Sequence, residues 1–167
     1  KEMKEVLTAY KAQEFIKPYI GIPKSQIVKK IEEISLPTPL VLKIVSKKAL
    51  HKTEINGVKI VKNKDELNAE FQELIKTAKR KNLPLEGILV QEFISGQELI
   101  IGIKKDPTFN HVIVFGLGGI FTEILKDISI RKCPINSHDA DEMFSEIKSR
   151  VILQGVRGKK LNLLLLK

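Results

Sequence analysis

The sequence contains few of the residues that would tie a protein to a membrane, to an oxidising compartment or to unpaired nucleic acid. Its 167 residues include one cysteine, Cys133, and no tryptophan. One cysteine cannot close a disulfide within the chain, so the count fits a reducing compartment, and we expect the cytoplasm. No apolar run reaches the roughly 18 residues that span a bilayer, so we expect no membrane partner.

Aromatic residues make up 5% of the chain, and no basic run is interleaved with them. Stacking on unpaired bases needs such aromatics, so we expect no nucleic-acid partner despite the formal net charge of +9. The charge fits either a polyanionic ligand, such as nucleotide phosphates or coenzyme A, or a lysine-rich surface. Hydrophobic residues reach 43%, which indicates a globular chain.

The hydrophobic pattern predicts an α+β fold. Short apolar runs bounded by polar or glycine-containing stretches indicate strands. These runs lie at residues 40–45, 58–61, 87–92, 98–104 and 111–115. The last three follow one another with short connections, which favours one antiparallel run of strands. Asn63, three residues before Glu66, predicts the start of a helix.

Two residues in the first half of the chain could act on phosphate. Lys43 interrupts an apolar strand; aimed into a cleft it would be a good point charge for phosphate, and at a strand edge it would face water. His51 lies in a polar stretch between two predicted strands. A loop imidazole can act as a nucleophile toward phosphorus, or it can be an ordinary surface residue.

Two segments in the middle of the chain could bind a nucleotide. Gln91, Glu92, Phe93 and Ile94 follow an apolar strand, where backbone groups can meet the edge of adenine and apolar side chains can cover its faces. Glu98 could accept hydrogen bonds from a ribose. The alternative for this stretch is a polar turn between strands.

A glycine-rich segment and a row of charges follow. Residues 116–119 could bring backbone N–H groups to phosphates or could simply form a turn. Glu123, Asp127 and Arg131 recur at four-residue steps, which indicates either the wall of a charged cleft or a solvated face. The three histidines and the single cysteine lack the spacing of metal ligands, so we expect no zinc site.

Five segments occur together in the order found in one enzyme family. They are residues 39–46, 50–59, 88–92, 98–107 and 115–131, the last reading Phe-Gly-Leu-Gly-Gly-Ile-Phe-Thr-Glu-Ile-Leu-Lys-Asp-Ile-Ser-Ile-Arg. Together they resemble the ATP-grasp, or beta, subunit of ADP-forming acyl-CoA synthetases, such as acetyl-CoA synthetase, which are related to succinyl-CoA synthetase. The resemblance covers nearly the whole chain, most firmly residues 39–158.

The resemblance implies an ATP-grasp fold, in which two α+β lobes hold ATP between their sheets. We expect the lobes to span approximately residues 22–92 and 93–167. It also implies the interconversion of acyl-CoA, ADP and phosphate with the free acid, CoA and ATP, with Mg²⁺ as a cofactor. A CoA-binding alpha subunit is the implied partner in a hetero-oligomer, and it would hold CoA and the acyl substrate.

The same resemblance assigns roles to individual residues. His51 would carry the phosphoryl group, in a Leu-His-Lys-Thr-Glu context where the family usually has Leu-His-Lys-Ser-Asp. The other assigned residues are Lys43 for the phosphates, Gln91, Glu92, Phe93 and Ile94 for the adenine, Glu98 for the ribose, and Glu123 and Arg131 for the cleft.

One departure from the family pattern leaves a second function open. The family continues with a helix and a Leu-Asp-Ile-Asn-Pro strand whose polar residues bind Mg²⁺, whereas residues 155–167 here run differently. We therefore expect an incomplete C-terminal part and assign no metal ligand. The alternative function is a non-catalytic, ATP-binding regulatory module of an acyltransferase-type protein. The sequence does not identify the acyl group.

Overall fold

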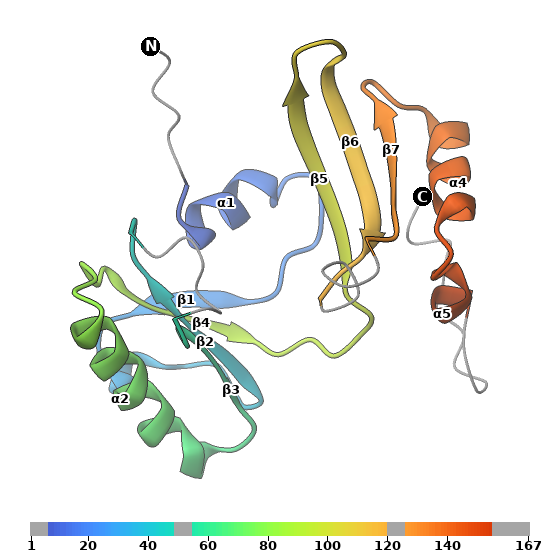
Figure 1. Ribbon diagram of the computed structural model, residues 1–167. Coiled ribbons are helices and arrows are strands. Elements are labelled where there is room, and N and C mark those ends of the chain that lie inside the picture. Colours follow the sequence, from blue (N-terminus) through green and yellow to red (C-terminus); the bar gives the residue numbers. More distant parts are fainter. Residues whose placement is uncertain (1–6, 49–54, 120–125, 155–167) are drawn as a thin grey trace. The chain divides into compact units, whose positions relative to one another are not determined.

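The computed structural model describes residues 7–48, 55–119 and 126–154. The chain forms two compact units, Lys1–Ile94 (unit 1) and Ser95–Lys167 (unit 2). Each unit combines one antiparallel sheet with helices, which Figure 1 shows and which confirms the predicted α+β class. The division between the units falls after Ile94. The approximate lobe bounds 22–92 and 93–167 stay a prediction.

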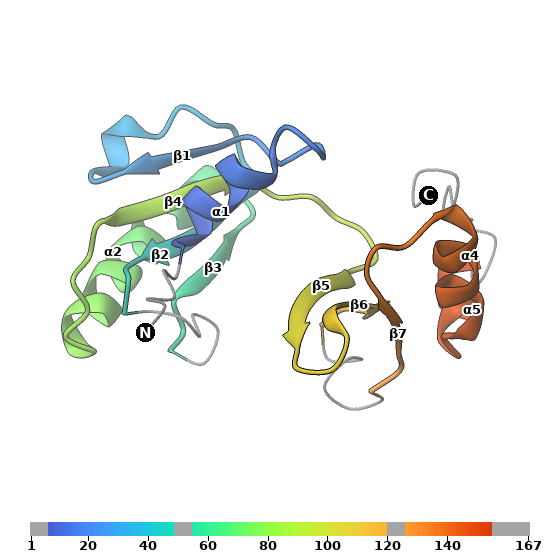
Figure 2. The same cartoon turned by 90° about the horizontal axis from the view of Figure 1, so that it is seen from above.

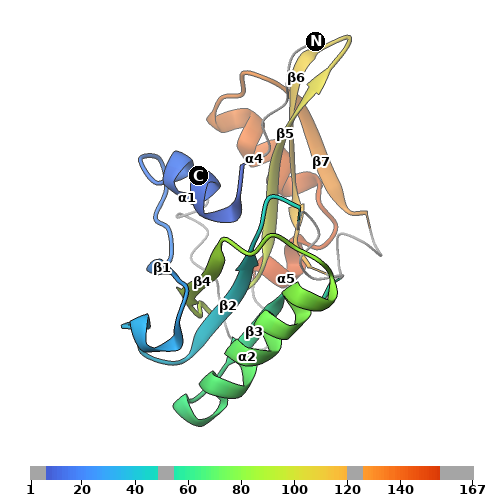
Figure 3. The ribbon, with the colours of Figure 1, turned by 90° about the vertical axis from the view of Figure 1, so that its left-hand side faces the viewer.

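Unit 1 is built on a four-stranded sheet in the order β1-β4-β2-β3. Its strands are β1 (Ser25–Val28), β2 (Leu40–Val45), β3 (Val58–Val61) and β4 (Gly87–Glu92). All neighbouring pairs are antiparallel. Figure 3 shows β4, the last of these strands in sequence, between β1 and β2, so β4 is the strand that joins β1 to the β2–β3 pair.

The core of unit 1 lies between this sheet and helix α2 (Lys64–Arg80). Its buried members are Val28, Leu40, Leu42, Ile44, Val61, Phe71, Leu74, Ala78, Ile88 and Val90. Successive side chains of a strand point to opposite faces of its sheet. Since the even-numbered residues of β2 and β4 face α2, Lys43 and Gln91 lie on the other face.

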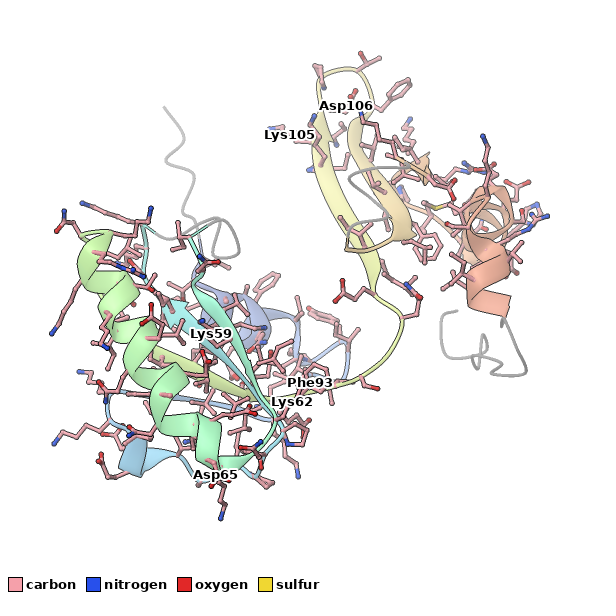
Figure 4. The ribbon with its side chains drawn as sticks, turned by 60° about the horizontal axis from the view of Figure 1, so that its bottom comes forward. Lys59, Lys62, Asp65, Phe93, Lys105 and Asp106 are labelled. Carbon is pink, nitrogen blue, oxygen red and sulfur yellow. The ribbon has the colours of Figure 1, made fainter. Side chains whose placement is uncertain are left out.

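Helix α2 begins where the sequence predicts. The side-chain oxygen of Asn63 accepts a hydrogen bond of 3.1 Å from the N–H of Glu66, which satisfies a donor that the first turn leaves free. The carboxylate of Glu66 in turn accepts from the N–H of Lys62 at 3.0 Å. Figure 4 shows Lys62 and Asp65 at this junction, which anchors the connection from β3 to the helix.

Two short helices complete unit 1. Helix α1 (Ala9–Ile16) has no buried residue, and Phe15 within it is 71% exposed. The 3-10 helix η1 (Ile31–Glu33) follows β1, and Ile31 packs against the core. Neither helix contributes a residue to the buried core.

Unit 2 contains a three-stranded sheet in the order β5-β6-β7. The strands are β5 (Leu99–Asp106), β6 (Asn110–Leu117) and β7 (Ile128–Lys132), and both pairs are antiparallel. Figure 4 marks Lys105 and Asp106 at the β5–β6 turn. The Asp106 carboxylate accepts from the N–H groups of Thr108 and Phe109 at 2.9 Å each, and this Asx turn closes the hairpin.

Helices α4 (Ser137–Glu146) and α5 (Arg150–Gln154) follow the sheet of unit 2. Asn136 caps α4, and it forms a capping box in which Asn136 and Asp139 each bind the other's backbone N–H. Figure 2 shows α4 beside β7. The buried side chains of Leu117, Ile147 and Leu153 form a second, smaller core there.

One prediction about the strands is wrong. We expected residues 87–92, 98–104 and 111–115 to form one antiparallel run, but β4 pairs with β1 and β2, and only β5 and β6 form a hairpin. The first five residues of β4 are all buried, as befits a central strand covered on both faces. No residue of β5 is buried. The difference in burial reflects membership of two separate sheets.

Candidate functional site

Lys43 and Gln91 meet on the face of the unit 1 sheet that does not pack against α2. Lys43 lies opposite Leu89 and Gln91 lies opposite Val41, so the two side chains are diagonal neighbours on adjacent strands. The Nζ of Lys43 donates a hydrogen bond of 2.7 Å to the Oε1 of Gln91. The sequence singled out both residues but did not predict that they form a pair.

This pair fixes the orientation of the Gln91 amide. An ammonium group can only donate, so the amide oxygen must face Lys43 and the NH₂ group must face away. Gln91 is 5% exposed, and the part of the chain that the structure describes provides no hydrogen-bond partner for its Nε2. A buried amide donor without an acceptor costs about 1–3 kcal/mol. The site therefore favours a ligand that brings an acceptor atom.

The other residues predicted to bind adenine have two kinds of environment: some make contacts that hold the chain together, and others have exposed side chains. The carboxylate of Glu92 accepts from the N–H of Lys24 at 2.8 Å, so this side chain ties β4 to the segment before β1. The N–H of Phe93 donates to the carbonyl of Pro39 at 3.1 Å. Phe93 is 36% exposed and Ile94 is 64% exposed. Figure 4 shows Phe93 at the same end of the sheet as Lys62. The exposed side chains of Phe93 and Ile94 supply apolar surface.

In unit 2 the structure brings Glu98 together with the glycine-rich segment. Glu98 directly precedes β5, and its carbonyl accepts from the N–H of Gly118 at 2.8 Å. Gly119 follows with a φ of +64°, in the left-handed region that glycine adopts without strain. Gly116 and Leu117 thus end β6, and Gly118 and Gly119 follow beside Glu98. A phosphate contact of this segment stays a prediction.

Arg131 lies on the α4 side of the β7 strand. Its guanidinium forms an ion pair with Glu146 and a longer one of 3.4 Å with Glu142, both on α4. The hydroxyl of Ser129, two residues earlier, donates to Glu146 at 2.6 Å. Ser129 is 4% exposed, so this network is part of the packing between helix and sheet. The contact of Arg131 with a nucleotide stays a prediction.

The hydrogen bond from Arg131, and then that from Ser129, lower the pKa of Glu146 from 4.5 to about 2, against the opposing effect of burial. The folded-state pKa is below the unfolded one, so the carboxylate stabilises unit 2 fully above pH 4.5, and this contribution is lost as the pH falls toward 2. We expect Glu146→Gln to lower the urea midpoint of unit 2 at pH 6, and the difference from wild type to shrink toward pH 3.

The matched control is Glu73→Gln, which removes an exposed carboxylate paired with Arg80 in unit 1. An exposed pair of this kind contributes about 0–1 kcal/mol, so its effect should be small at every pH. A Glu146→Gln difference that stays constant between pH 6 and pH 3 would contradict the assigned network.

Asp127 has a structural role. Its carboxylate accepts from the N–H groups of Lys148 at 3.0 Å and Ser149 at 2.6 Å, at the turn between α4 and α5. Burial acts to raise the pKa of Asp127, but the hydrogen bonds from Ser149 and Lys148 outweigh it and leave the pKa below its usual value. Asp127 and Arg131 thus both contact the segment from α4 to α5.

Two of the predicted site residues, His51 and Glu123, lie outside the described residues. Within the described ranges no group of three or more His, Cys, Asp or Glu side chains could hold a metal ion. Over the same ranges no helix is both long enough and apolar enough to cross a membrane.

Comparison with known proteins shows which protein family the sequence matches. A family model of the ATP-grasp domain matches residues 1–167. The beta subunit of acetate–CoA ligase (ADP-forming) I from Pyrococcus furiosus is 40% identical over 159 residues, which are 89% of this chain and 68% of that subunit. The 4-hydroxybutyrate–CoA ligase (ADP-forming) from Nitrosopumilus maritimus is 38% identical over 96% of this chain, which spans 24% of that protein.

Solved structures show the same likeness. The dinucleotide-forming acetyl-coenzyme A synthetase 1 of Ca. Korarchaeum cryptofilum, in complex with coenzyme A and Ca-AMPCP, has a TM-score of 0.86 at 39% identity, covering 92% of this chain and 72% of that one. With coenzyme A and Mg-AMPPCP, the same enzyme has a TM-score of 0.77 at 34% identity, covering 96% and 73% of the two chains. In that complex a phosphohistidine segment points toward the nucleotide-binding site.

Proposed function

The chain belongs to the ATP-grasp domain family, and on that premise we propose that it is the nucleotide-binding part of an ADP-forming acyl-CoA synthetase, with acetyl-CoA as the first candidate substrate. In the proposed reaction, acyl-CoA, ADP and phosphate are interconverted with the free acid, CoA and ATP. One observation carries the proposal. His51 stands in the Leu-His-Lys-Thr-Glu segment of a chain whose relative carries a phosphohistidine segment directed at the nucleotide.

Unit 1 would contribute the charge and the base-binding groups. Lys43 is a point charge on the sheet face away from α2, suited to neutralising a phosphate. Its pairing with Gln91 leaves the amide NH₂ as a donor for an acceptor atom of the nucleotide. The exposed side chains of Phe93 and Ile94 offer apolar cover for an adenine ring. Glu92 would support this adenine-binding segment by accepting a hydrogen bond from the N–H of Lys24.

Unit 2 would contribute Glu98 to the ribose. A carboxylate accepts hydrogen bonds at two oxygens, and the 2′- and 3′-hydroxyl groups of a ribose offer two donors with matching separation. Glu98 is exposed at the start of β5, where a ligand can reach it. Arg131 is committed to Glu142 and Glu146, so a phosphate contact would require it to leave them. For Glu123 the cleft role likewise remains a proposal.

The chemical step would transfer the γ-phosphoryl group of ATP to His51. An unprotonated ring nitrogen attacks the phosphorus, the bond between phosphorus and the β,γ-bridging oxygen breaks, ADP leaves and the ring releases a proton. Phosphoryl transfer depends on positioning and charge neutralisation, which Lys43 can supply. Mg²⁺ would enter with the nucleotide and neutralise further phosphate charge. The reverse step makes ATP.

The proposed partner is a CoA-binding alpha subunit or domain. The chain spans about a quarter of one relative and about two thirds of another. Coenzyme A is bound in the complexes of the Korarchaeum enzyme. A histidine that exchanges phosphate with ADP needs a second site that loads it from acyl-CoA and phosphate. We place CoA and the acyl group in that partner.

Incubation of the purified protein with γ-labelled Mg-ATP tests this function. Phosphohistidine is stable in base and labile in acid, so we expect label that survives alkali, is lost in acid, and is released as ATP when ADP is added. Bound ATP without label would support the regulatory module instead. No ATP binding, measured by calorimetry on the same preparation, would contradict both functions.

A further inference from the structure

We infer that Gly118 and Gly119, directly after β6, position the carboxylate of Glu98, and that Gly119 is a positioning residue for ribose recognition. The inference rests on the proposed role of Glu98 and deepens it. The sequence left two interpretations of these glycines, a phosphate contact or a turn. The contacts assign them a third role, which depends on the absence of side chains.

Gly118 holds the main chain of Glu98 in place. Its N–H donates to the carbonyl of Glu98 at 2.8 Å and so extends the β5–β6 ladder one step beyond the Leu99–Leu117 pair. A Cβ on Gly118 would lie 3.0 Å from the Cβ of Glu98 and 3.1 Å from its carbonyl carbon. These distances are tighter than ordinary van der Waals contact, so the two strands approach this closely because residue 118 has no side chain.

Gly119 lies next to the carboxylate of Glu98. A Cβ built on Gly119 would lie 2.7 Å from the Oε2 of Glu98. The carboxylate therefore occupies the space that a side chain at position 119 would take. The φ of +64° at Gly119 turns the chain under this carboxylate, and an L-residue with a Cβ adopts that conformation only under strain.

Other glycines in the structure differ in what surrounds them. A Cβ on Gly102, in the middle of β5, would meet nothing within 4 Å, and the same holds for Gly96 in the segment before Glu98. A Cβ on Gly116, in β6, would lie 2.7 Å from the carbonyl oxygen of Asp127. At Gly118 and Gly119 the atoms in the way belong to Glu98 and Leu99, so the absence of a Cβ there leaves the space that Glu98 occupies.

The orientation of the Glu98 carboxylate matters because a hydrogen-bonding group that is already oriented loses less entropy when a ligand binds. When the carboxylate of Glu98 lies in the space beside Gly119, it presents its oxygens in one place to the ribose hydroxyls. A methyl group at residue 119 would displace the flexible end of the side chain, because the atom in its way is a carboxylate oxygen and not backbone. The expected defect is therefore in sugar recognition.

The test measures the ratio of dissociation constants for 2′-deoxy-ATP and 3′-deoxy-ATP relative to ATP, by calorimetry. A hydrogen bond to a charged group is worth about 1.5–3 kcal/mol, so the wild type should prefer ATP by about tenfold or more over at least one analogue. In Gly119→Ala we expect that preference to fall to within about threefold, close to the value in Glu98→Ala. A general structural defect would weaken all three nucleotides equally and leave the ratio unchanged.

Three further variants isolate the contact. Gly102→Ala adds the same methyl group where there is space. Asn110→Ala, at a φ of +66° in the β5–β6 turn, imposes similar backbone strain away from Glu98. Both should keep the wild-type ratio. Gly119→Asn tolerates the left-handed conformation better than alanine and should also lose the preference, so it replaces Gly119→Ala if that variant does not fold.

The outcomes separate the inference from the function beneath it. If the Gly119 variants keep the wild-type ratio of dissociation constants while Glu98→Ala loses the preference for ATP, the positioning role of Gly119 is wrong and the ribose contact of Glu98 is supported. If Glu98→Ala binds ATP with an unchanged ratio, both the ribose contact and the positioning role are wrong. Failure of the wild type to bind ATP would remove the proposed function and this inference together.

Discussion

Replacing His51 with asparagine is expected to abolish the acid-labile, base-stable label that γ-labelled Mg-ATP leaves on the protein. Asparagine keeps a polar side chain of similar reach but has no ring nitrogen that can attack phosphorus. Loss of a nucleophile lowers the rate by more than about a thousandfold in enzymes where this has been measured. Nucleotide affinity should change little, because Lys43, Gln91 and Glu98 remain.

The chain provides its own controls for this experiment. It contains three histidines, and the other two are His111 at the start of β6 and His138 in α4. The side chain of His138 is 81% exposed and lies 3.6 Å from Glu142. We expect His111→Asn and His138→Asn to be labelled like the wild type. Label that persists in His51→Asn and disappears in one of the others would move the phosphoryl acceptor to that residue.

Phe71→Ala is expected to lower the unfolding free energy of unit 1 by about 3–5 kcal/mol, the usual loss for a buried phenylalanine. Phe71 is 1% exposed and packs between α2 and the sheet, together with Leu74 and Ile44. The expected loss is a large part of the 5–15 kcal/mol that stabilises a typical domain.

Hydrogen exchange followed by mass spectrometry measures this effect separately in each unit. Peptides from β2, α2 and β4 should lose protection in Phe71→Ala, while peptides from β5, β6 and β7 should keep theirs. The matched control is Phe15→Ala, which removes the same side chain from a position that is 71% exposed in unit 1. Its effect should be within about 0.5 kcal/mol. Equal loss of protection in both units would mean that they unfold together.

The sequence predicts well those elements whose signal is local. The strand Leu40–Val45 is a continuous apolar run around one lysine, and its predicted bounds are those of β2. Asn63 acts as a helix cap, as predicted, because Glu66 lies three residues away along the chain. The ATP-grasp fold followed from five ordered segments, and the family comparison confirms it.

Features that depend on pairing between distant segments were not predictable. Nothing within residues 87–92 shows that β4 pairs with β1 and β2 and not with β5. The Lys43–Gln91 contact joins residues on neighbouring strands, and their register becomes known only when the strands are paired. A period-2 pattern places each on one face of its own strand, and that was the only available signal.

The charged row after the glycines shows a different limit. Its four-residue spacing fits a helix or a strand, but β7 begins at Ile128, so Asp127 precedes the strand that holds Arg131. Asp127 then binds backbone at the α4–α5 turn, and Arg131 binds carboxylates on α4. Spacing alone could not separate these two roles, because both partners come from residues later in the chain.

The central place of β4 also determines when unit 1 can fold during synthesis. β1 leaves the ribosome early, but its neighbour in the sheet is β4. Ser25 therefore cannot pair until Gln91 has been synthesised. A nascent chain that stops before Gly87 has β2, β3 and α2 but nothing to link them to β1. Domains generally fold as units, and contacts between residues far apart in sequence form slowly. Unit 1 therefore has its full sheet only after its last strand has emerged, and chaperones would meet it with β1 still unpaired.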